Sequence, residues 1–231
     1  MVASARYLQR VGRWDLALAA LPTQPAGMVA ELRAEILVDR HLWRLDPVDE
    51  AETAIATVQA GGSTALAALL RGQLVYWRML FSLGPAPDGA KRAGDALARA
   101  AKDPRFEGWA TFWLGVLADN VLDDRAAAAE RYAQAAHLAR AQHDRLLESF
   151  TTRHQGAHLL MGGNRVEGID LLRRSLHLRA SVGAVPPVAA AQTALAEELP
   201  PGEERATLRE TALATARELD LTWLRRGLDD P

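Results

Sequence analysis

A strict alternation of apolar and polar residues, which marks a half-buried β-strand, never persists along this chain. The strong helix formers Ala, Leu, Arg and Glu dominate the sequence instead. Prolines, glycines and aspartates interrupt it repeatedly, as at Gly61 and Gly62, and segments of about 8 to 20 residues lie between the interruptions. This pattern predicts roughly twelve helices and a short terminal turn. We expect the helices at 3–11, 14–21, 26–44, 48–60, 64–83, 88–102, 105–121, 124–142, 145–161, 165–181, 187–199 and 203–219, and the turn at 221–228.

Small residues recur at the positions where two antiparallel helices would touch. In the segment from Gly156 to Ser175, Gly156 and Gly168 fall on two successive helices, and Gly163 falls on the reversal between them. Two helices approach to roughly 8–10 Å only when the residues at their crossing point are small. Leu172 would fill the gap that remains. The chain is therefore expected to fold into about six antiparallel helix pairs.

A second stretch carries the same helix-pair signal in a recognisable form. Leu114 and Gly115 lie in one predicted helix, and Ala128 and Tyr132 lie four apart in the next. Tetratricopeptide repeats have the pattern W-x2-L-G-x2-Y in their first helix and A-x3-F in their second. On these residues the chain resembles the tetratricopeptide-repeat family, most clearly over 105–180, and is similar to small bacterial proteins of that type.

The resemblance implies an all-α fold, a right-handed superhelical solenoid of about six antiparallel helix pairs. The Pro- and Gly-rich interruptions are short turns, and none of them is long enough to be a flexible linker. We therefore expect one domain over residues 1–231. Repeats of this class build a scaffold with a concave inner face, and the resemblance implies no catalytic activity.

Composition narrows the possible functions. The 231 residues carry a net charge of −2, which argues against a protein that binds nucleic acid through phosphate contacts. The absence of cysteine excludes disulfides, thiolate metal sites and a cysteine nucleophile. No apolar secretory segment and no apolar run of ~18 residues occurs. We therefore expect a cytoplasmic protein with neither a signal peptide nor a membrane span.

The sequence lacks the common catalytic motifs. It has neither G-x-x-x-x-G-K nor G-x-G-x-x-G after a strand, and neither H-E-x-x-H nor a G-x-S-x-G nucleophile elbow. An ordinary kinase, dehydrogenase or hydrolase would carry one of these motifs. Their absence favours a protein without enzymatic activity and without a cofactor, and leaves an unusual activity open.

The resemblance also implies that the first helix of each pair lines an inner groove, with the face beside the small contact residue pointing into it. Carrying this rule to Gly72, Gly115 and Gly156 gives a groove rich in aromatic rings, with Arg153 and His154 at one end. Aromatic side chains with a polar tip suit recognition, and an arginine beside them suits a carboxylate or phosphate. The alternative is that the rings only pack within the core. The candidate ligand-binding residues are Tyr76, Trp77, Trp109, Phe112, Trp113, Asp119, Asn120, Arg153, His154 and His158.

His154 and His158 lie four residues apart on one predicted helix, so both rings can face one point. The spacing suits a metal ion if Asp119 or Glu148 supplies a third ligand, and it suits an acid–base pair near neutral pH. The alternative, which we favour, is that hydrogen bonds satisfy these histidines, with no metal site and no catalytic residue. Arg179 is expected to form an ion pair with an acidic neighbour.

Two functions remain open. The first is a non-enzymatic scaffold whose aromatic groove binds an extended peptide, a helix of a protein partner or an apolar small molecule. The alternative is an enzyme or biosynthetic accessory protein with a pocket of about 300–1,000 Å³ inside the superhelix, lined by Arg153, His154 and His158. The apolar segment 187–199, if it forms an uncapped edge, also suggests a homodimer.

Overall fold

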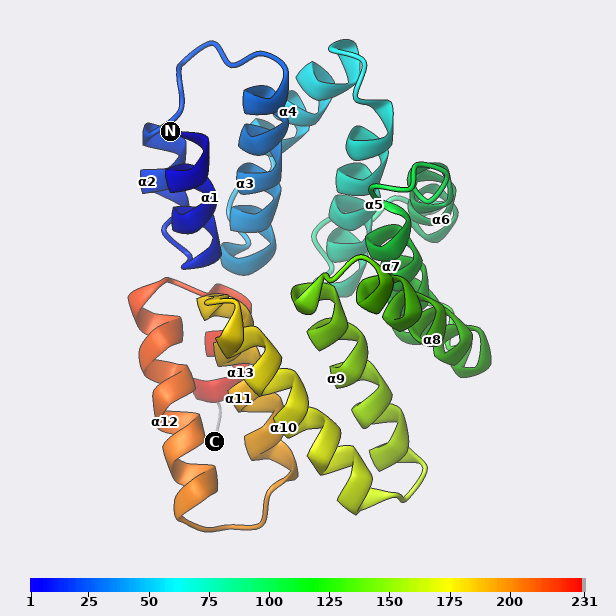
Figure 1. Cartoon of the computed structure of the whole chain (residues 1–231), viewed down its shortest axis with the longest axis vertical. Helices are drawn as coiled ribbons and strands as arrows, with labels where there is room; N and C mark the ends of the chain where they lie inside the picture. The colour runs from blue at the N-terminus through cyan, green and yellow to red at the C-terminus, as the bar shows by residue number, and fades with distance from the viewer. Residues whose placement is uncertain (230–231) are drawn as a thin grey trace.

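The segments rich in helix formers fold as α-helices, as predicted. The computed structural model describes residues 1–229, and no β-strand occurs in that range (Figure 1). Short turns join most of the helices. The helices are α1 (Val2–Arg10), α2 (Trp14–Ala19), α3 (Met28–Arg44), α4 (Asp49–Ala60), α5 (Thr64–Leu80), α6 (Gly89–Ala100), α7 (Glu107–Asn120), α8 (Arg125–Ala141), α9 (Arg145–Met161), α10 (Arg165–Ser181), α11 (Val185–Glu198), α12 (Glu203–Glu218) and α13 (Thr222–Asp229).

The boundaries of α1 to α12 agree with the predicted ones to within about three residues. The terminal turn predicted at 221–228 is wrong, because this segment forms helix α13. Leu221, Leu224 and Leu228 are all buried, and their spacing of three and four places them on one face of a helix. So short an apolar pattern does not by itself stabilise a helix, and packing of α13 against α3 and α12 supplies what the local sequence lacks.

Glycines allow the close approach within the α9–α10 pair, as the sequence predicted. A Cβ atom on Gly156 would lie 3.0 Å from the carbonyl oxygen of Gly168, and the reverse distance, from Gly168 to the Gly156 carbonyl, is also 3.0 Å. Leu172 is buried beside this contact, and Gly163 turns the chain with a positive φ of 84°. Helices α5 and α6, α7 and α8, and α11 and α12 pack as similar adjacent pairs.

The first and last helices of the chain meet. Buried residues of α1, α2 and α3 share one hydrophobic cluster with residues of α11, α12 and α13. Arg13 forms an ion pair with Glu218, and Arg44 Nε donates to the Leu219 carbonyl oxygen at 3.3 Å. A Cβ atom on Gly12 would lie only 2.8 Å from a methyl carbon of Leu219. The helices therefore form a closed arrangement rather than an open row (Figure 1).

This closure overturns one expectation about the surface. Helix α11 includes most of the segment 187–199, for which an uncapped apolar edge was considered as the surface of a homodimer. It packs against α10 and α12, and its residues Pro187, Ala189 and Leu195 are buried. The expected edge is wrong because the chain covers it with its own helices, so the homodimer prediction loses the surface on which it was based. Within residues 1–229, no helix combines the length and the apolar character needed to span a bilayer.

Candidate functional site

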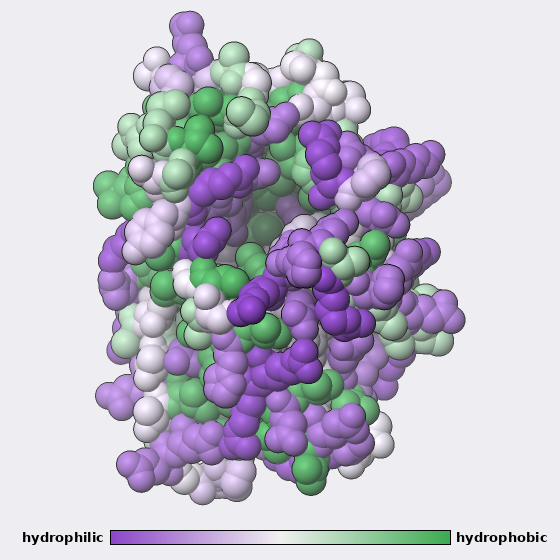
Figure 2. Space-filling model, viewed as in Figure 1, coloured by the Kyte–Doolittle hydropathy of each residue, from purple (hydrophilic) through white to green (hydrophobic). Residues whose placement is uncertain are grey.

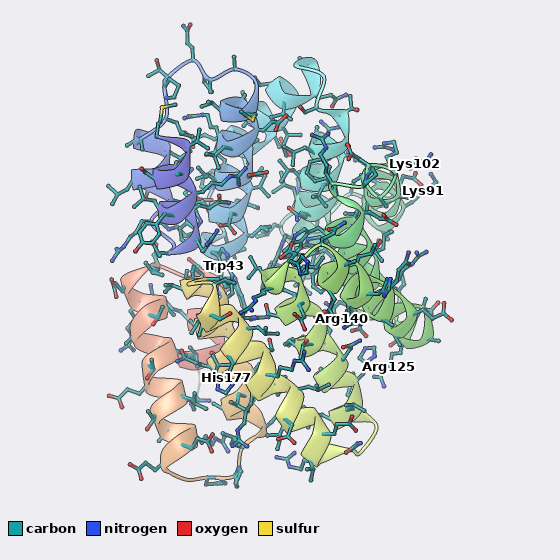
Figure 3. All side chains as sticks on the ribbon, viewed as in Figure 1. Trp43, Lys91, Lys102, Arg125, Arg140 and His177 are labelled. Atoms are coloured by element: carbon teal, nitrogen blue, oxygen red, sulfur yellow. The ribbon has the colours of Figure 1, made fainter. Side chains whose placement is uncertain are left out.

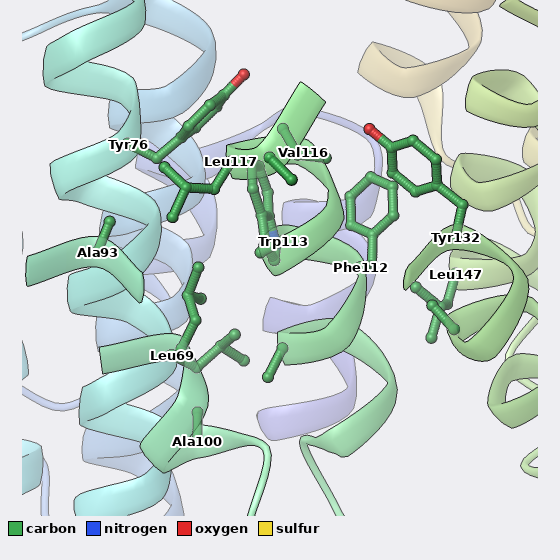
Figure 4. Close-up of a cluster of buried hydrophobic side chains, with 14 of the residues drawn as sticks. Leu69, Tyr76, Ala93, Ala100, Phe112, Trp113, Val116, Leu117, Tyr132 and Leu147 are labelled. Atoms are coloured by element: carbon green, nitrogen blue, oxygen red, sulfur yellow. The ribbon is translucent and has the colours of Figure 1, made fainter. Parts of the chain in front are cut away.

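Two adjacent polar residues at the C-terminal end of α7, Asp119 and Asn120, each form a hydrogen bond with a tyrosine of another helix. Figure 4 shows Tyr76 of α5 and Tyr132 of α8 on opposite sides of α7, with both hydroxyls toward the same end of that helix. Asn120 Nδ2 donates to the Tyr76 hydroxyl at 2.6 Å, and the Tyr132 hydroxyl donates to Asp119 Oδ2 at 3.0 Å. Burial raises the pKa of Tyr76 to about 12 and raises the pKa of Tyr132 well above its usual range. Both hydroxyls therefore stay protonated at neutral pH.

Helix α9 supplies two histidines to the same carboxylate. His158 Nε2 lies 3.0 Å from Asp119 Oδ2, and His154 Nδ1 lies 3.9 Å from it. The His154 ring also stacks on Tyr132, with the ring centroids 4.6 Å apart. The contacts with His154, His158 and Tyr132 lower the pKa of the Asp119 carboxyl below its ordinary range. Asp119 is therefore an ionised acceptor that organises the rings around it.

His154 is a buried and neutral imidazole. Burial, reinforced by the positive charge of Arg153, lowers its pKa to about 3 although Asp119 acts in the opposite direction. Arg153 Nη1 lies 3.4 Å from His154 Nδ1, so the arginine places its positive charge directly beside the ring. Among the residues that the structure describes, no three His, Asp or Glu side chains are arranged to hold a metal ion.

Arg179 of α10 lies beside this cluster, and the ion pair predicted for it is wrong. The side chain is only 4% exposed, and Nη1 donates to the Pro187 carbonyl oxygen at 2.7 Å. Its guanidinium lies 4.4 Å from the centre of the Phe150 ring, and Nε has no hydrogen-bond partner. Burial and the nearby charge of Arg153 lower the pKa of Arg179 to about 9, so it remains charged at neutral pH. The packing of α10 against α11 carries this side chain away from the acidic surface residues.

Aromatic rings of α3, α13, α5 and α7 form a continuous row. We call it the aromatic row, and it consists, in order, of Trp43, Trp223, Trp77 and Trp113, with Phe81 beside Trp77. Trp223 of α13 stacks on Trp43 of α3 with 5.4 Å between centroids, and lies 6.2 Å from Trp77 of α5. Trp77 stacks on Phe81 at 5.0 Å and lies 6.3 Å from Trp113 of α7. Figure 3 places Trp43 where α3 meets the C-terminal helices. Helix α13 therefore adds a ring to the surface that was predicted as an open groove.

Three indoles of the aromatic row have no hydrogen-bond acceptor. The Nε1 atoms of Trp77, Trp113 and Trp223 are buried without a partner. The Trp43 indole, by contrast, donates to Asp39 at 3.1 Å. Nearly all buried polar groups in native proteins are paired, so three unpaired donors in one row require an explanation.

The face of the molecule in Figure 2 is hollowed between α3 and α5, with hydrophobic residues at the floor of the hollow and polar residues around it. A different depression of about 430 Å³ lies along α10 beside Arg173 and Arg174. These two arginines already form ion pairs with Glu204 and Glu148, at 2.8 and 2.9 Å. We therefore place the candidate site at the aromatic row, which joins α3, α5, α7 and α13, rather than on α10.

The structure connects the ten predicted residues through ring contacts and hydrogen bonds, and it buries several of them. The buried ones are Tyr76, Phe112, Trp113 and His154. The half-buried ones are Trp77, Trp109, Asp119, Arg153 and His158, and Asn120 is exposed. Trp109 is held by Asp144, which accepts its indole N–H at 2.9 Å while capping α9. Glu148, considered as a metal ligand, pairs with Arg174 instead.

Four residues that shape the site were not among those predicted. Tyr132 was assigned to helix packing, and its hydroxyl was the signal that it also carries a polar role. Trp223 lies in the segment that was expected to be a turn, and Trp43 lies on a helix without a clear repeat motif. Arg179 was expected to be paired. Trp43 and Trp223 meet through a contact between helices that are distant in the sequence, which local patterns do not reveal. Tyr132 and Arg179 contact neighbouring helices, and there the pattern leaves open which side chain faces which partner.

No model of a known protein family matches the chain, and no curated protein matches it either. The resemblance to tetratricopeptide repeats therefore stays a prediction, and the chemistry of the site carries the functional conclusion.

Proposed function

We propose that this chain is a non-enzymatic binding protein, built as a tetratricopeptide-like superhelix whose two ends meet, and that its ligand lies against the aromatic row. The observation that carries the proposal is the set of buried indole N–H groups without an acceptor, at Trp77, Trp113 and Trp223. Leaving one buried donor unpaired costs about 1–3 kcal/mol, so we infer that a ligand that enters between these rings and separates them supplies the acceptor that the chain lacks. The lack of the common catalytic motifs supports binding rather than turnover.

The same row indicates the kind of ligand. Indoles offer a large apolar area together with one N–H donor, and this combination is frequent at recognition surfaces. A matching ligand combines apolar groups with carbonyl acceptors. An extended peptide, a helix of a protein partner and an apolar small molecule with carbonyl groups all meet this requirement. The hollow visible in Figure 2 is the position that we propose for it.

A defined pool of ligands tests the proposal. The full chain is immobilised and incubated with random synthetic heptapeptides and, separately, with small apolar carbonyl compounds, and the retained molecules are identified by mass spectrometry. Trp77→Phe and Trp113→Phe each keep a ring and remove one N–H, so each should weaken retention about tenfold. Trp14→Phe is the matched control, because the Trp14 indole already donates to Asp39 at 2.8 Å. If the unsubstituted protein retains nothing from either pool, the proposal fails.

One observation favours a second candidate, an enzyme with a pocket inside the superhelix. Asp119 Oδ2 lies 3.0 Å from His158 Nε2 and also accepts from Tyr132, so the carboxylate orients an imidazole as in a general-base pair. Molecules recovered after long incubation with the protein distinguish the two candidates. An unchanged mass supports binding alone. A changed mass that disappears in the His158→Gln variant supports catalysis.

A further inference from the structure

Arg153 and Arg179 place two positive charges beside one another. Phe150 and Arg153 lie three residues apart on α9, so they share one face of that helix. The Arg179 guanidinium lies over the Phe150 ring at 4.4 Å, which brings it to the same face from α10. Within residues 1–229 neither arginine forms an ion pair with a carboxylate.

Asp119, which is ionised, offsets at most one of the two positive charges. His154, which Arg153 Nη1 contacts at 3.4 Å, is neutral. Asp119 lies nearby but already accepts a hydrogen bond from Tyr132 and contacts His158 at 3.0 Å. Arg179 has one protein acceptor, the Pro187 carbonyl oxygen, and this acceptor is uncharged. The net charge of the cluster is therefore positive.

A purely structural role does not explain this arrangement well. Removing a charge from water costs several kcal/mol unless an opposite charge and hydrogen bonds compensate for it. Arg179 is 4% exposed, and its Nε has no hydrogen-bond partner. An apolar side chain of similar length would pack on Phe150 without that penalty. A guanidinium at this position is expected to have a negatively charged partner from outside the chain.

We propose that Arg153 and Arg179 bind an anionic group, a carboxylate or a phosphate, carried by the ligand of the aromatic row. This inference rests on the proposed binding function and names the class of ligand. Guanidinium groups bind both anions through paired N–H donors. The rings of Trp109 and Phe112 lie 5.5 and 5.6 Å from Phe150, so the surroundings of the charge are aromatic and match a ligand with an apolar body. The ligand is therefore an organic acid or organic phosphate with an apolar body.

Thermal unfolding in the presence of three matched probes tests the inference. The full chain is melted at constant ionic strength with phenyl phosphate, with phenylacetate or with neutral benzyl alcohol. At a concentration ten times its dissociation constant, a bound anion should raise the Tm by about 3–5 °C. We expect this rise with at least one of the two anions and not with the alcohol. The probe that gives the larger rise distinguishes a phosphate site from a carboxylate site.

Variants then assign the effect to the two arginines. Arg153→Gln and Arg179→Met remove one charge each, and we expect each to abolish most of the rise caused by the anion. Arg179→Lys keeps the charge and should retain part of it, which separates loss of binding from loss of fold. Arg174→Gln is the matched control, because Arg174 is an exposed arginine of the same helix that pairs with Glu148 at 2.9 Å.

The outcomes separate this inference from the proposed function. An equal rise in Arg179→Met and in the unsubstituted protein would overturn the inference, and so would the absence of any rise with both anions. If neutral peptides are retained equally by Arg153→Gln and Arg179→Met, the binding function stands without an anion site. The anions can also stabilise the protein through both arginines while the protein retains no heptapeptide and no carbonyl compound. In that case the anion site stands and the proposed function fails.

Discussion

Protonation of His154 in the unfolded chain should weaken this fold as the pH falls. Burial and the charge of Arg153 hold the pKa of His154 at about 3 in the folded protein, whereas its ordinary value is 6.5. The pKa is lower in the folded protein, so between pH 3 and pH 6.5 the histidine is protonated in the unfolded chain and neutral in the folded chain. The stability that depends on neutral His154 is present above pH 6.5 and is lost as the pH falls toward 3. From pH 7 to pH 5 the loss is about 2 kcal/mol.

Asp39 acts in the opposite direction over the same range. Burial raises its pKa to about 6 from an ordinary value of 3.8, although the indoles of Trp14 and Trp43 donate to it. The folded chain therefore takes up this proton first, and stability from Asp39 rises by about 1 kcal/mol as the pH falls from 7 to 5. The two effects cancel in part in the unsubstituted protein. The pH dependence of the whole protein is thus a poor test, and a variant is needed.

Urea unfolding of the His154→Gln variant, followed by tryptophan fluorescence at pH 7 and pH 5, isolates the first effect. At pH 7 the variant should be less stable, because it loses the stacking on Tyr132. At pH 5 the difference in unfolding free energy should be about 2 kcal/mol smaller, because only the unsubstituted chain carries the histidine that is protonated on unfolding. For Asp39→Asn the difference should instead grow by about 1 kcal/mol. A His154→Gln difference that is the same at both pH values would refute the reasoning.

Three further predictions concern packing and hydrogen bonds. Gly168→Ala should lower the unfolding free energy by about 1–3 kcal/mol, because the new Cβ would lie 2.6 Å from Leu160 Cγ, as chemical denaturation will show. Tyr132→Phe should cost about 1–2 kcal/mol, since Asp119 loses a hydrogen-bond donor in a half-buried position, and urea titration measures this. Trp223→Ala should cost about 3–5 kcal/mol by removing a ring from the aromatic row, with a red shift of the remaining tryptophan emission.

Two control variants separate the effects predicted above from the general effects of adding a methyl group to a helix or removing a hydroxyl. Gly227→Ala lies on α13 where no atom would be within 4 Å of the new Cβ, so it should be neutral or slightly stabilising. Tyr7→Phe removes a hydroxyl from an exposed tyrosine and should change stability by less than about 0.5 kcal/mol. Equal losses in Gly168→Ala and Gly227→Ala would show that crowding at the helix crossing is not the cause.

The sequence predicts local elements of this protein well, and its long-range contacts poorly. Prolines and glycines mark most of the helix ends, and the Gly156–Gly168 contact follows from the rule that crossing helices need small residues. The positions of Trp77 and Trp113 in the aromatic row follow from the helix faces on which these residues were predicted to lie. The position of Trp223 does not, because its contact with Trp43 joins segments about 180 residues apart. Arg179 was assigned a surface ion pair because its sequence neighbours do not show how deeply α10 and α11 bury it.

The contact between the two ends of the chain also affects how the protein is made. In an open repeat array each unit is stabilised by its immediate neighbours, so the first units can fold before the last are synthesised. Here Arg13 and Glu218 are separated by 205 positions, and Trp14 lies in the same cluster as Leu224 and Leu228. The ribosome must therefore deliver the chain through α13 before the apolar side of α1 to α3 is covered. Until then that side lacks its native partners.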